Sequence, residues 1–223
     1  MGIPILLFRL EGVLQSWGEH SKWDYRDTAD FPSKSGVIGL LGCALGLERD
    51  NIRLGEISRS LHMIVRADRA GEVVTDFQTV SAEVLYSASG KPRTGGNTFI
   101  THRNYLQDAS FLVGLSGDKA LLEELSNALW NPQWSIYLGR KSCVPSVPVT
   151  GCLKEEYDSL MQAMEEVPLT KRHDDTVMIE MECGHEEGRP RPDERTAEAG
   201  LHYQTRRVTV YTINAREAKN VSE

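Results

Sequence analysis

Apolar positions along the chain recur with two periods, one typical of strands and one typical of helices. Residues Ile3 to Leu10 (I-P-I-L-L-F-R-L) are β-prone and almost continuously apolar, which predicts a strand covered on both faces. Shorter apolar or alternating runs predict four further strands. These are residues 62–68, 111–115, 176–183 and 207–213.

Helical spacing appears in three other segments, which are residues 34–47, 54–61 and 118–130. The first is expected to begin at Ser33 or Ser35, because a hydroxyl can accept from the free N–H groups of a first turn, and to end at Gly46. Asp118 is the expected N-cap of the third helix. The third segment has the clearest amphipathic pattern of the three.

Residues 69–110 separate two predicted strands and are too long for an ordinary connection inside a compact domain. Several glycines and a proline interrupt them, so we expect a protruding β-hairpin. The order β, α, β, long insertion, β, α predicts an α+β fold of the ferredoxin-like or RRM type, with helices on one face of the sheet.

Nothing marks a clean linker, so the chain is expected to form one domain with two parts. Residues 1–153 would form an RRM-like palm carrying the insertion, and residues 154–223 an irregular, β-rich C-terminal extension. Residues 184–200 are charged and contain prolines, and we expect them to form a mobile loop.

Composition limits the class of protein. A chain of 223 residues that is 40% hydrophobic can bury a core without disulfides. No apolar run approaches the roughly 20 residues that span a bilayer, so a cytoplasmic protein without membrane contact is expected. The four cysteines form no C-x-x-C pair, so we predict reduced thiols and no metal site.

The net charge of −7 argues against a generic nucleic-acid binder, but the charge is distributed unevenly. Residues 1–153 carry 15 Lys and Arg against 16 Asp and Glu, whereas residues 154–223 carry 10 against 16. A nearly neutral first part can still hold a polyanion in a local basic cluster.

The stretch F-P-S-K-S-G-V-I-G-L-L-G-C-A-L-G-L (31–47) superficially resembles a phosphate-binding loop. It lacks the glycines of a Walker A loop, and its own glycines fall inside the helix at intervals unlike those of a dinucleotide fingerprint. The glycines are expected to give a smooth face for close packing. At the head of the helix, Lys34 and Ser35 with free N–H groups predict an anion site.

Three other segments mix planar or cationic side chains with small residues, as sites for stacked nucleotides and their phosphates do. They are Gln15-Ser16-Trp17-Gly18, His102-Arg103-Asn104-Tyr105 and Tyr137-Leu-Gly-Arg140-Lys141-Ser142. The aromatic residues could instead belong to the core and the cations to a solvated surface, so these residues alone leave both interpretations open.

Catalytic motifs such as G-x-S-x-G or H-E-x-x-H do not occur, and no cofactor is predicted. His102 and Arg103 with Tyr105 could still act as a general acid and base in metal-independent RNA cleavage. Besides RNA binding and RNA cleavage, the sequence leaves a third hypothesis, which is an unrelated enzyme that binds a phosphate ligand on an α+β scaffold.

Four segments in collinear order, from the first strand to about Pro148, closely resemble the CasD family. They are F-R-L-E-G-V-L-Q-S-W-G (8–18), F-P-S-K-S-G-V-I-G-L-L-G-C-A-L-G-L (31–47), H-R-N-Y-L-Q-D-A-S-F (102–111) and Y-L-G-R-K-S-C (137–143). Members of this family are the type I-E CRISPR-associated subunits that cap the 5′ end of the crRNA in Cascade. The resemblance implies an RRM-type palm that holds the repeat-derived 5′ handle and a thumb, matching residues 69–110, that presses over the crRNA.

The resemblance also implies a role in antiviral defence, partners and a lack of catalysis. The partners would be the crRNA, a CasC-type backbone subunit and a CasA-type large subunit, with target DNA reached indirectly through the complex. Cutting is assigned to another subunit, CasE, whereas the type I-C sibling branch cuts its own pre-crRNA with a Tyr and a Lys-His pair that this sequence lacks. The candidate RNA contacts are Gln15, Ser16, Trp17, Lys34, Ser35, His102, Arg103, Tyr105, Arg140, Lys141 and Ser142.

Overall fold

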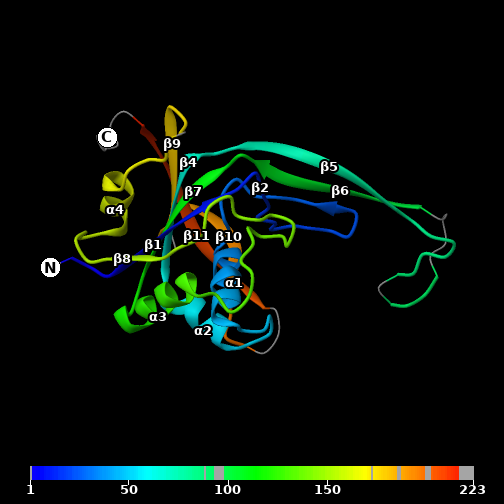
Figure 1. The fold of residues 1–223 in the computed structure, drawn as a ribbon, viewed down its shortest axis with the longest axis horizontal. Helices are drawn as coiled ribbons and strands as arrows, with labels where there is room; N and C mark the ends of the chain where they lie inside the picture. Colours follow the sequence, from blue (N-terminus) through cyan, green and yellow to red (C-terminus); the bar gives the residue numbers. More distant parts are fainter. Residues whose placement is uncertain are drawn as a thin grey trace.

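The computed structural model of the chain describes residues 2–87, 89–92, 98–171, 173–184, 187–198 and 202–215. Its largest element is a seven-stranded antiparallel sheet in the order β10-β11-β9-β4-β7-β1-β8 (Figure 1). The strands are β1 (Ile5–Glu11), β4 (His62–Arg69), β7 (Ser110–Ser116), β8 (Cys152–Lys154), β9 (Thr176–Glu182), β10 (Arg189–Arg195) and β11 (Tyr203–Asn214).

Strand β1 is covered on both faces, as its continuous apolar run predicts. Leu6 and Phe8 belong to the larger core under α1 (Lys34–Leu45), α2 (Arg53–Ser60) and α3 (Lys119–Trp130). Ile5 and Leu7 point to the opposite face and pack in a smaller core with Met164 of α4 (Leu160–Glu166). Because side chains alternate along a strand, a strand in the middle layer must be apolar at nearly every position.

The α+β class is confirmed by this arrangement of a largely antiparallel sheet with packed helices. The segment β8-β1-β7-β4, with α1 after β1 and α3 after β7, is the order that a ferredoxin-like sheet requires. Strands β9, β11 and β10 extend that sheet beyond β4. The narrower ferredoxin-like class and the boundary at residue 153 stay predictions.

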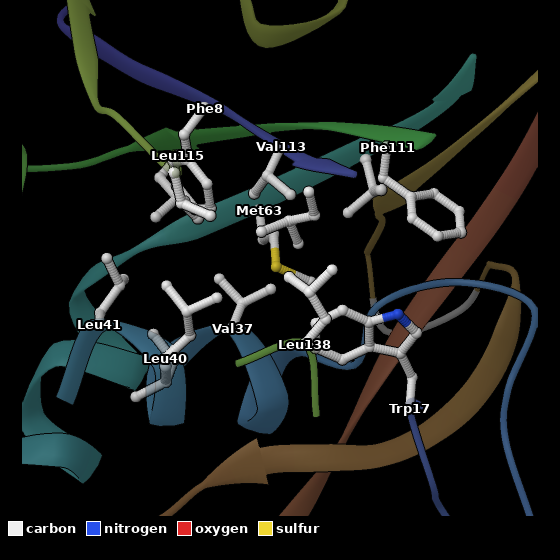
Figure 2. Close-up of a cluster of buried hydrophobic side chains, with 14 of the residues drawn as sticks. Phe8, Trp17, Val37, Leu40, Leu41, Met63, Phe111, Val113, Leu115 and Leu138 are labelled. Atoms are coloured by element: carbon white, nitrogen blue, oxygen red, sulfur yellow. The ribbon is translucent and has the colours of Figure 1, made fainter. Parts of the chain in front are cut away.

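Helix α1 begins and ends where the sequence predicts. The Ser33 hydroxyl accepts from the Gly36 N–H at 3.2 Å, and Gly46 closes the helix in the left-handed region with φ of 70°. The glycine face packs closely in part: a Cβ on Gly36 would lie 2.9 Å from Trp17, and one on Gly42 would lie 2.6 Å from Leu54. Figure 2 shows the Trp17 indole beside Val37 of α1 and Leu138.

The predicted hairpin is formed by β5 (Glu72–Ser81) and β6 (Thr98–Gln107), paired over ten residues of each strand. It projects from the body of the protein (Figure 1). At its base, β2 (Leu14–Gln15) pairs antiparallel with β6, and β3 (Tyr25–Arg26) pairs with β6 in parallel. Part of the predicted insertion, residues 88 and 93–97, lies outside the described residues.

The prediction of a mobile loop over residues 184–200 is wrong at residues 189–195, which form β10. Residues 185–186 and 199–200 of that segment lie outside the described residues. Alternate side chains of β10 point inward, and the buried Arg191 pairs with Glu180 and with Glu19. Asp193, also buried, accepts two hydrogen bonds from Arg206, at 2.6 and 3.0 Å. Arg191 and Asp193, two of the charges that suggested a solvated loop, therefore belong to internal ion pairs.

The described helices include none that is long and apolar enough to cross a membrane.

Candidate nucleic-acid interface

The turn at residues 137–143 brings basic side chains beside the loop that follows β1. The Cys143 N–H donates to the Arg140 carbonyl oxygen at 2.8 Å, which closes the turn. Gly139 has φ of +85°, and a Cβ there would lie 1.7 Å from the carbonyl oxygen of Ser16. Only glycine allows both this backbone conformation and this close approach.

Arg140 leaves this turn and stacks over Tyr105 of β6, with 4.6 Å between its Cζ atom and the ring centroid. Its Nη2 donates to the carbonyl oxygens of Arg26 and Asp27, both at 3.2 Å. Its Nη1 is buried and has no acceptor among the described residues. The guanidinium is therefore held by the Tyr105 ring and by two carbonyl oxygens, and its Nη1 group has unused hydrogen-bonding capacity.

Arg103 approaches the same place from β6. It lies opposite Arg26 in the parallel pairing of β6 with β3, and Arg26 in turn stacks over Trp23 at 5.6 Å. The Nε of Arg103 is buried, and no described residue accepts a hydrogen bond from it. Two paired strands thus carry arginines at opposite positions, and both arginines line one pocket.

A basic pocket of about 580 Å³ opens between these elements. It is lined by Ser16, Gly18, Ser21, Arg26, Arg103, Gly139, Arg140, Lys141 and Ser142. None of its four cationic side chains forms an ion pair with a carboxylate in the part of the chain that the structure describes. Four uncompensated cations around small polar residues favour a phosphate-bearing ligand.

Asp27 lies next to this pocket and stays ionised. Burial would raise the pKa of Asp27, but hydrogen bonds from the Ser21 hydroxyl and from the backbone N–H groups of His20 and Glu19 lower it. The carboxylate therefore holds the loop at residues 18–27 in place and is unsuited to donating a proton.

Five of the predicted residues line the basic pocket, namely Ser16, Arg103, Arg140, Lys141 and Ser142. Ser35 instead lines a neighbouring, larger groove that shares Ser16 and Lys141 with the pocket. Tyr105 is only 5% exposed and supports Arg140 from below, so it positions a cation and offers no open face for a base.

The side chains of Gln15 and Trp17 are buried, so both support the site from the core, and Trp17 also borders the larger groove. Gln15 is fully buried, and its Nε2 donates to the carbonyl oxygens of Leu10 and Ala109 at 3.1 and 2.9 Å. Its Oε1 accepts from the Trp17 indole N–H at 3.1 Å. The two side chains fasten the loop after β1 to the core, and that loop carries Ser16 into the pocket.

Lys34 also differs from its prediction as a phosphate ligand. Its ammonium is buried and pairs with Glu194 at 2.7 Å and with Glu182 at 2.9 Å. Its backbone N–H donates to Asp193 at 2.7 Å, so a carboxylate of β10 already occupies the head of α1. The anion site that the sequence predicts exists, but the chain fills it with its own acidic residues.

His102 and Tyr105, proposed as an acid and base pair, do not converge. Successive side chains of β6 point to opposite faces, so His102 and Tyr105, three residues apart, lie on different sides of the hairpin. His102 is exposed and packs edge-on against Phe77, with 5.4 Å between ring centroids. Among the described residues, no group of three or more His, Cys, Asp or Glu side chains could hold a metal ion.

Arg26 is the cation of the basic pocket that the sequence did not predict, and Ser21 also lines the pocket unpredicted. The stretch Trp23-Asp-Tyr-Arg26 mixes aromatic and cationic residues in the same way as the segments that were singled out. That signal could have identified it, although its pairing with β6 depends on a two-residue strand that no periodicity reveals.

Comparisons with known proteins identify the family to which this chain belongs. The family described as CRISPR-associated protein (Cas_Cas5) matches residues 5–209, so the chain belongs to that family. It is 35% identical over 156 residues to the CRISPR system Cascade subunit CasD of Escherichia coli strain K12, covering 65% of this chain and 68% of CasD.

Two solved structures agree with this assignment over nearly the whole chain. A chain of a CRISPR RNA-guided surveillance complex has a TM-score of 0.73 and 30% identity, covering 94% of this chain and 90% of its own length. A Cas protein crystal structure has a TM-score of 0.71 and 35% identity, with 97% and 98% covered.

Proposed function

We propose that this chain is a non-catalytic crRNA-binding subunit of a type I-E CRISPR Cascade surveillance complex. The basic pocket is the observation that carries the proposal, because four cations from three separate segments converge there without carboxylate partners among the described residues. The pocket would hold the sugar-phosphate backbone of the repeat-derived 5′ handle. Phosphate contacts of this kind fix the position of an RNA without reading its sequence.

The hairpin β5–β6 would act as the thumb that caps the backbone filament. Val73 and Phe77 lie on one face of β5, and Ile100 lies on the same face of β6 because it stands opposite Thr79. All three apolar side chains are at least 43% exposed. An apolar stripe on a projecting hairpin suits contact with a CasC-type backbone subunit.

The large CasA-type subunit and the target DNA enter this proposal only through the complex. The E. coli relative is a Cascade subunit, and a structural relative is part of an RNA-guided surveillance complex. These two relatives support the proposal that this chain also works as one subunit of such a complex.

A non-catalytic role is favoured over cleavage of pre-crRNA. Metal-independent cleavage needs an acid and a base within reach of one phosphate. The separation of His102 and Tyr105 onto opposite faces of β6 removes that pair.

Binding of a labelled guide RNA, transcribed from the CRISPR repeat that accompanies the gene, tests this function. Arg103→Gln and Arg140→Gln should each weaken binding about tenfold, since each removes a charge-assisted hydrogen bond. Arg59→Gln, which removes an exposed cation of α2 outside the pocket, is the matched control and should bind as the wild type does. Equal binding by all four proteins, or cleavage of the RNA by the wild type, would refute the proposal.

A further inference from the structure

A second hollow, the α1 groove, has a volume of about 1100 Å³ and is continuous with the basic pocket through Ser16, Gly18, Gly139 and Lys141. One wall is the glycine face of α1. A Cβ added to Gly39 would meet no described atom within 4 Å, unlike one added to its neighbours on that face. The close packing predicted for this face therefore fails at Gly39, and bare helix backbone faces the groove.

Aromatic side chains also line the α1 groove. Trp134 and Tyr203 are each 46% exposed, and the Trp134 backbone N–H donates to the Cys43 carbonyl oxygen of α1 at 3.1 Å. Burial and the neighbouring Cys43 raise the pKa of Tyr137, which keeps its phenol neutral. Neutral rings facing a bare backbone wall suit an unstacked planar base.

Arg195, the last residue of β10, is the cation of this groove. It is 6% exposed, and its Nε has no acceptor within the described ranges. Its Nη2 donates to the Arg49 carbonyl oxygen, and its backbone N–H donates to the Ser58 hydroxyl at 3.2 Å. A buried guanidinium is unfavourable without a compensating negative charge.

Two other buried arginines, on β10 and β11, do have carboxylate partners, unlike Arg195. Arg191 pairs with Glu180, and Arg206 pairs with Asp193, both inside the ion-pair network that holds β10 against α1. Arg195 is buried to a similar degree, yet no described carboxylate pairs with it. Arg195 lines the groove, so an anionic ligand there would lie next to a guanidinium that has no carboxylate partner among the described residues.

We infer that the α1 groove receives an unstacked nucleotide of the guide RNA, with Arg195 binding its phosphate and Tyr203 and Trp134 contacting its base. The inference rests on the proposed function and deepens it, because it assigns an RNA-binding role to the C-terminal strands β10 and β11. The basic pocket then holds the adjoining phosphates, and the RNA passes from one hollow to the other over Gly139.

Gly39→Phe tests the groove without disturbing the core. The new side chain enters open space on a helix, so the melting temperature should not fall, because glycine is the weaker helix former. The ring would fill the groove, and the labelled guide RNA should bind at least about tenfold more weakly, as loss of base stacking implies. Asn127→Phe adds the same side chain to an exposed position of α3 and should bind as the wild type does.

Arg195→Gln tests the phosphate contact. Binding should weaken, and the slope of log affinity against log salt concentration should fall by about 0.7, the value for one phosphate contact on a single strand. A purely structural residue would not change that slope. Ultraviolet cross-linking followed by mass spectrometry should place an RNA adduct on Tyr203 or Trp134 in the wild type and lose it in Gly39→Phe.

The outcomes separate this inference from the proposed function. If the wild type binds guide RNA, Arg140→Gln weakens binding and both groove variants bind normally, the groove assignment is wrong while the proposed function stands. If the groove variants lose only their assembly with other Cascade subunits, the occupant is a protein and the inference is overturned. If the wild type does not bind guide RNA at all, both fail together.

Discussion

The guanidinium of Arg140 lies over the ring of Tyr105, 4.6 Å from its centroid, and this contact joins the turn at residues 137–143 to the base of the hairpin. Tyr105 is buried on β6, two residues after Arg103 and on the same face of the strand. The aromatic ring therefore anchors Arg140 to the strand that carries Arg103. A pocket built in this way is preorganised for phosphate groups.

Replacing Tyr105 with Leu should weaken guide RNA binding through Arg140. The lost cation–π contact is worth about 0.5–2 kcal/mol, or about two- to thirtyfold in affinity. Tyr105→Phe keeps the ring and should retain both stability and affinity. RNA titrations normalised to the folded fraction measure the effect, and equal affinities for the Leu and Phe variants would contradict the positioning role.

Gly139→Ala should damage both the fold and the pocket. Alanine in the left-handed region costs roughly 1–2 kcal/mol, and its Cβ would fall 1.7 Å from the Ser16 carbonyl oxygen, so the turn must move. Urea unfolding should show a loss of about 2 kcal/mol or more. Gly184→Ala, whose Cβ would meet no described atom within 4 Å, is the control and should change little. A stable Gly139→Ala protein with normal RNA binding would disprove the close approach.

Lys34→Met should reduce stability and leave RNA affinity intact. Its removal leaves Glu182 with only its longer contact to Arg206, at 3.4 Å, and its contact to His62, and leaves Glu194 with the hydrogen bond from Gln204. We expect a loss of roughly 2–4 kcal/mol, because these partly buried carboxylates lose their shortest ion pairs. Lys34→Met combined with Glu194→Gln should recover part of the loss in urea unfolding. Weaker RNA binding at unchanged stability would instead restore Lys34 as a phosphate ligand.

The same ion pair predicts a dependence of stability on pH. Burial would raise the pKa of Glu194, but hydrogen bonds from Lys34 and Gln204 and the charges of Lys34 and Arg206 lower it below the ordinary value of 4.5. A carboxyl whose pKa is lower in the folded state stabilises the fold above its unfolded pKa, and that contribution is lost as the pH falls through the folded pKa. The difference in unfolding free energy between wild type and Glu194→Gln should be constant above about pH 5.5 and shrink below 4.5. A difference that grows on acidification would contradict the pairing.

The sequence pattern predicted the elements that are determined by residues close together in the chain. The doubly covered β1, the Ser33 cap of α1 and the Asp118 cap of α3 follow from periodicity and from hydrogen bonds within one turn. Strand β10 could not be predicted in this way, because its charges are buried only through partners far along the chain. Lys34 and Glu194 are 160 residues apart.

The same distinction separates the pocket residues that the sequence identified from the residues that it misassigned or overlooked. Arg103, Arg140, Lys141 and Ser142 were identified because each stands in a short segment whose composition suits RNA, and the fold brings them together. Lys34 was misassigned since the sequence shows a lysine at a helix start but gives no sign that β10 carries carboxylates to it. Arg195 was overlooked because its segment appeared to be a loop.

Competition between two RNAs tests the central claim most directly. One is the guide RNA with its repeat-derived 5′ handle, and the other carries the same spacer without the handle. If the chain holds the handle, the complete RNA should displace the labelled guide at a concentration at least about tenfold lower, both RNAs should remain uncut, and Arg103→Gln with Arg140→Gln should abolish the preference. Equal competition by the two RNAs would contradict the account.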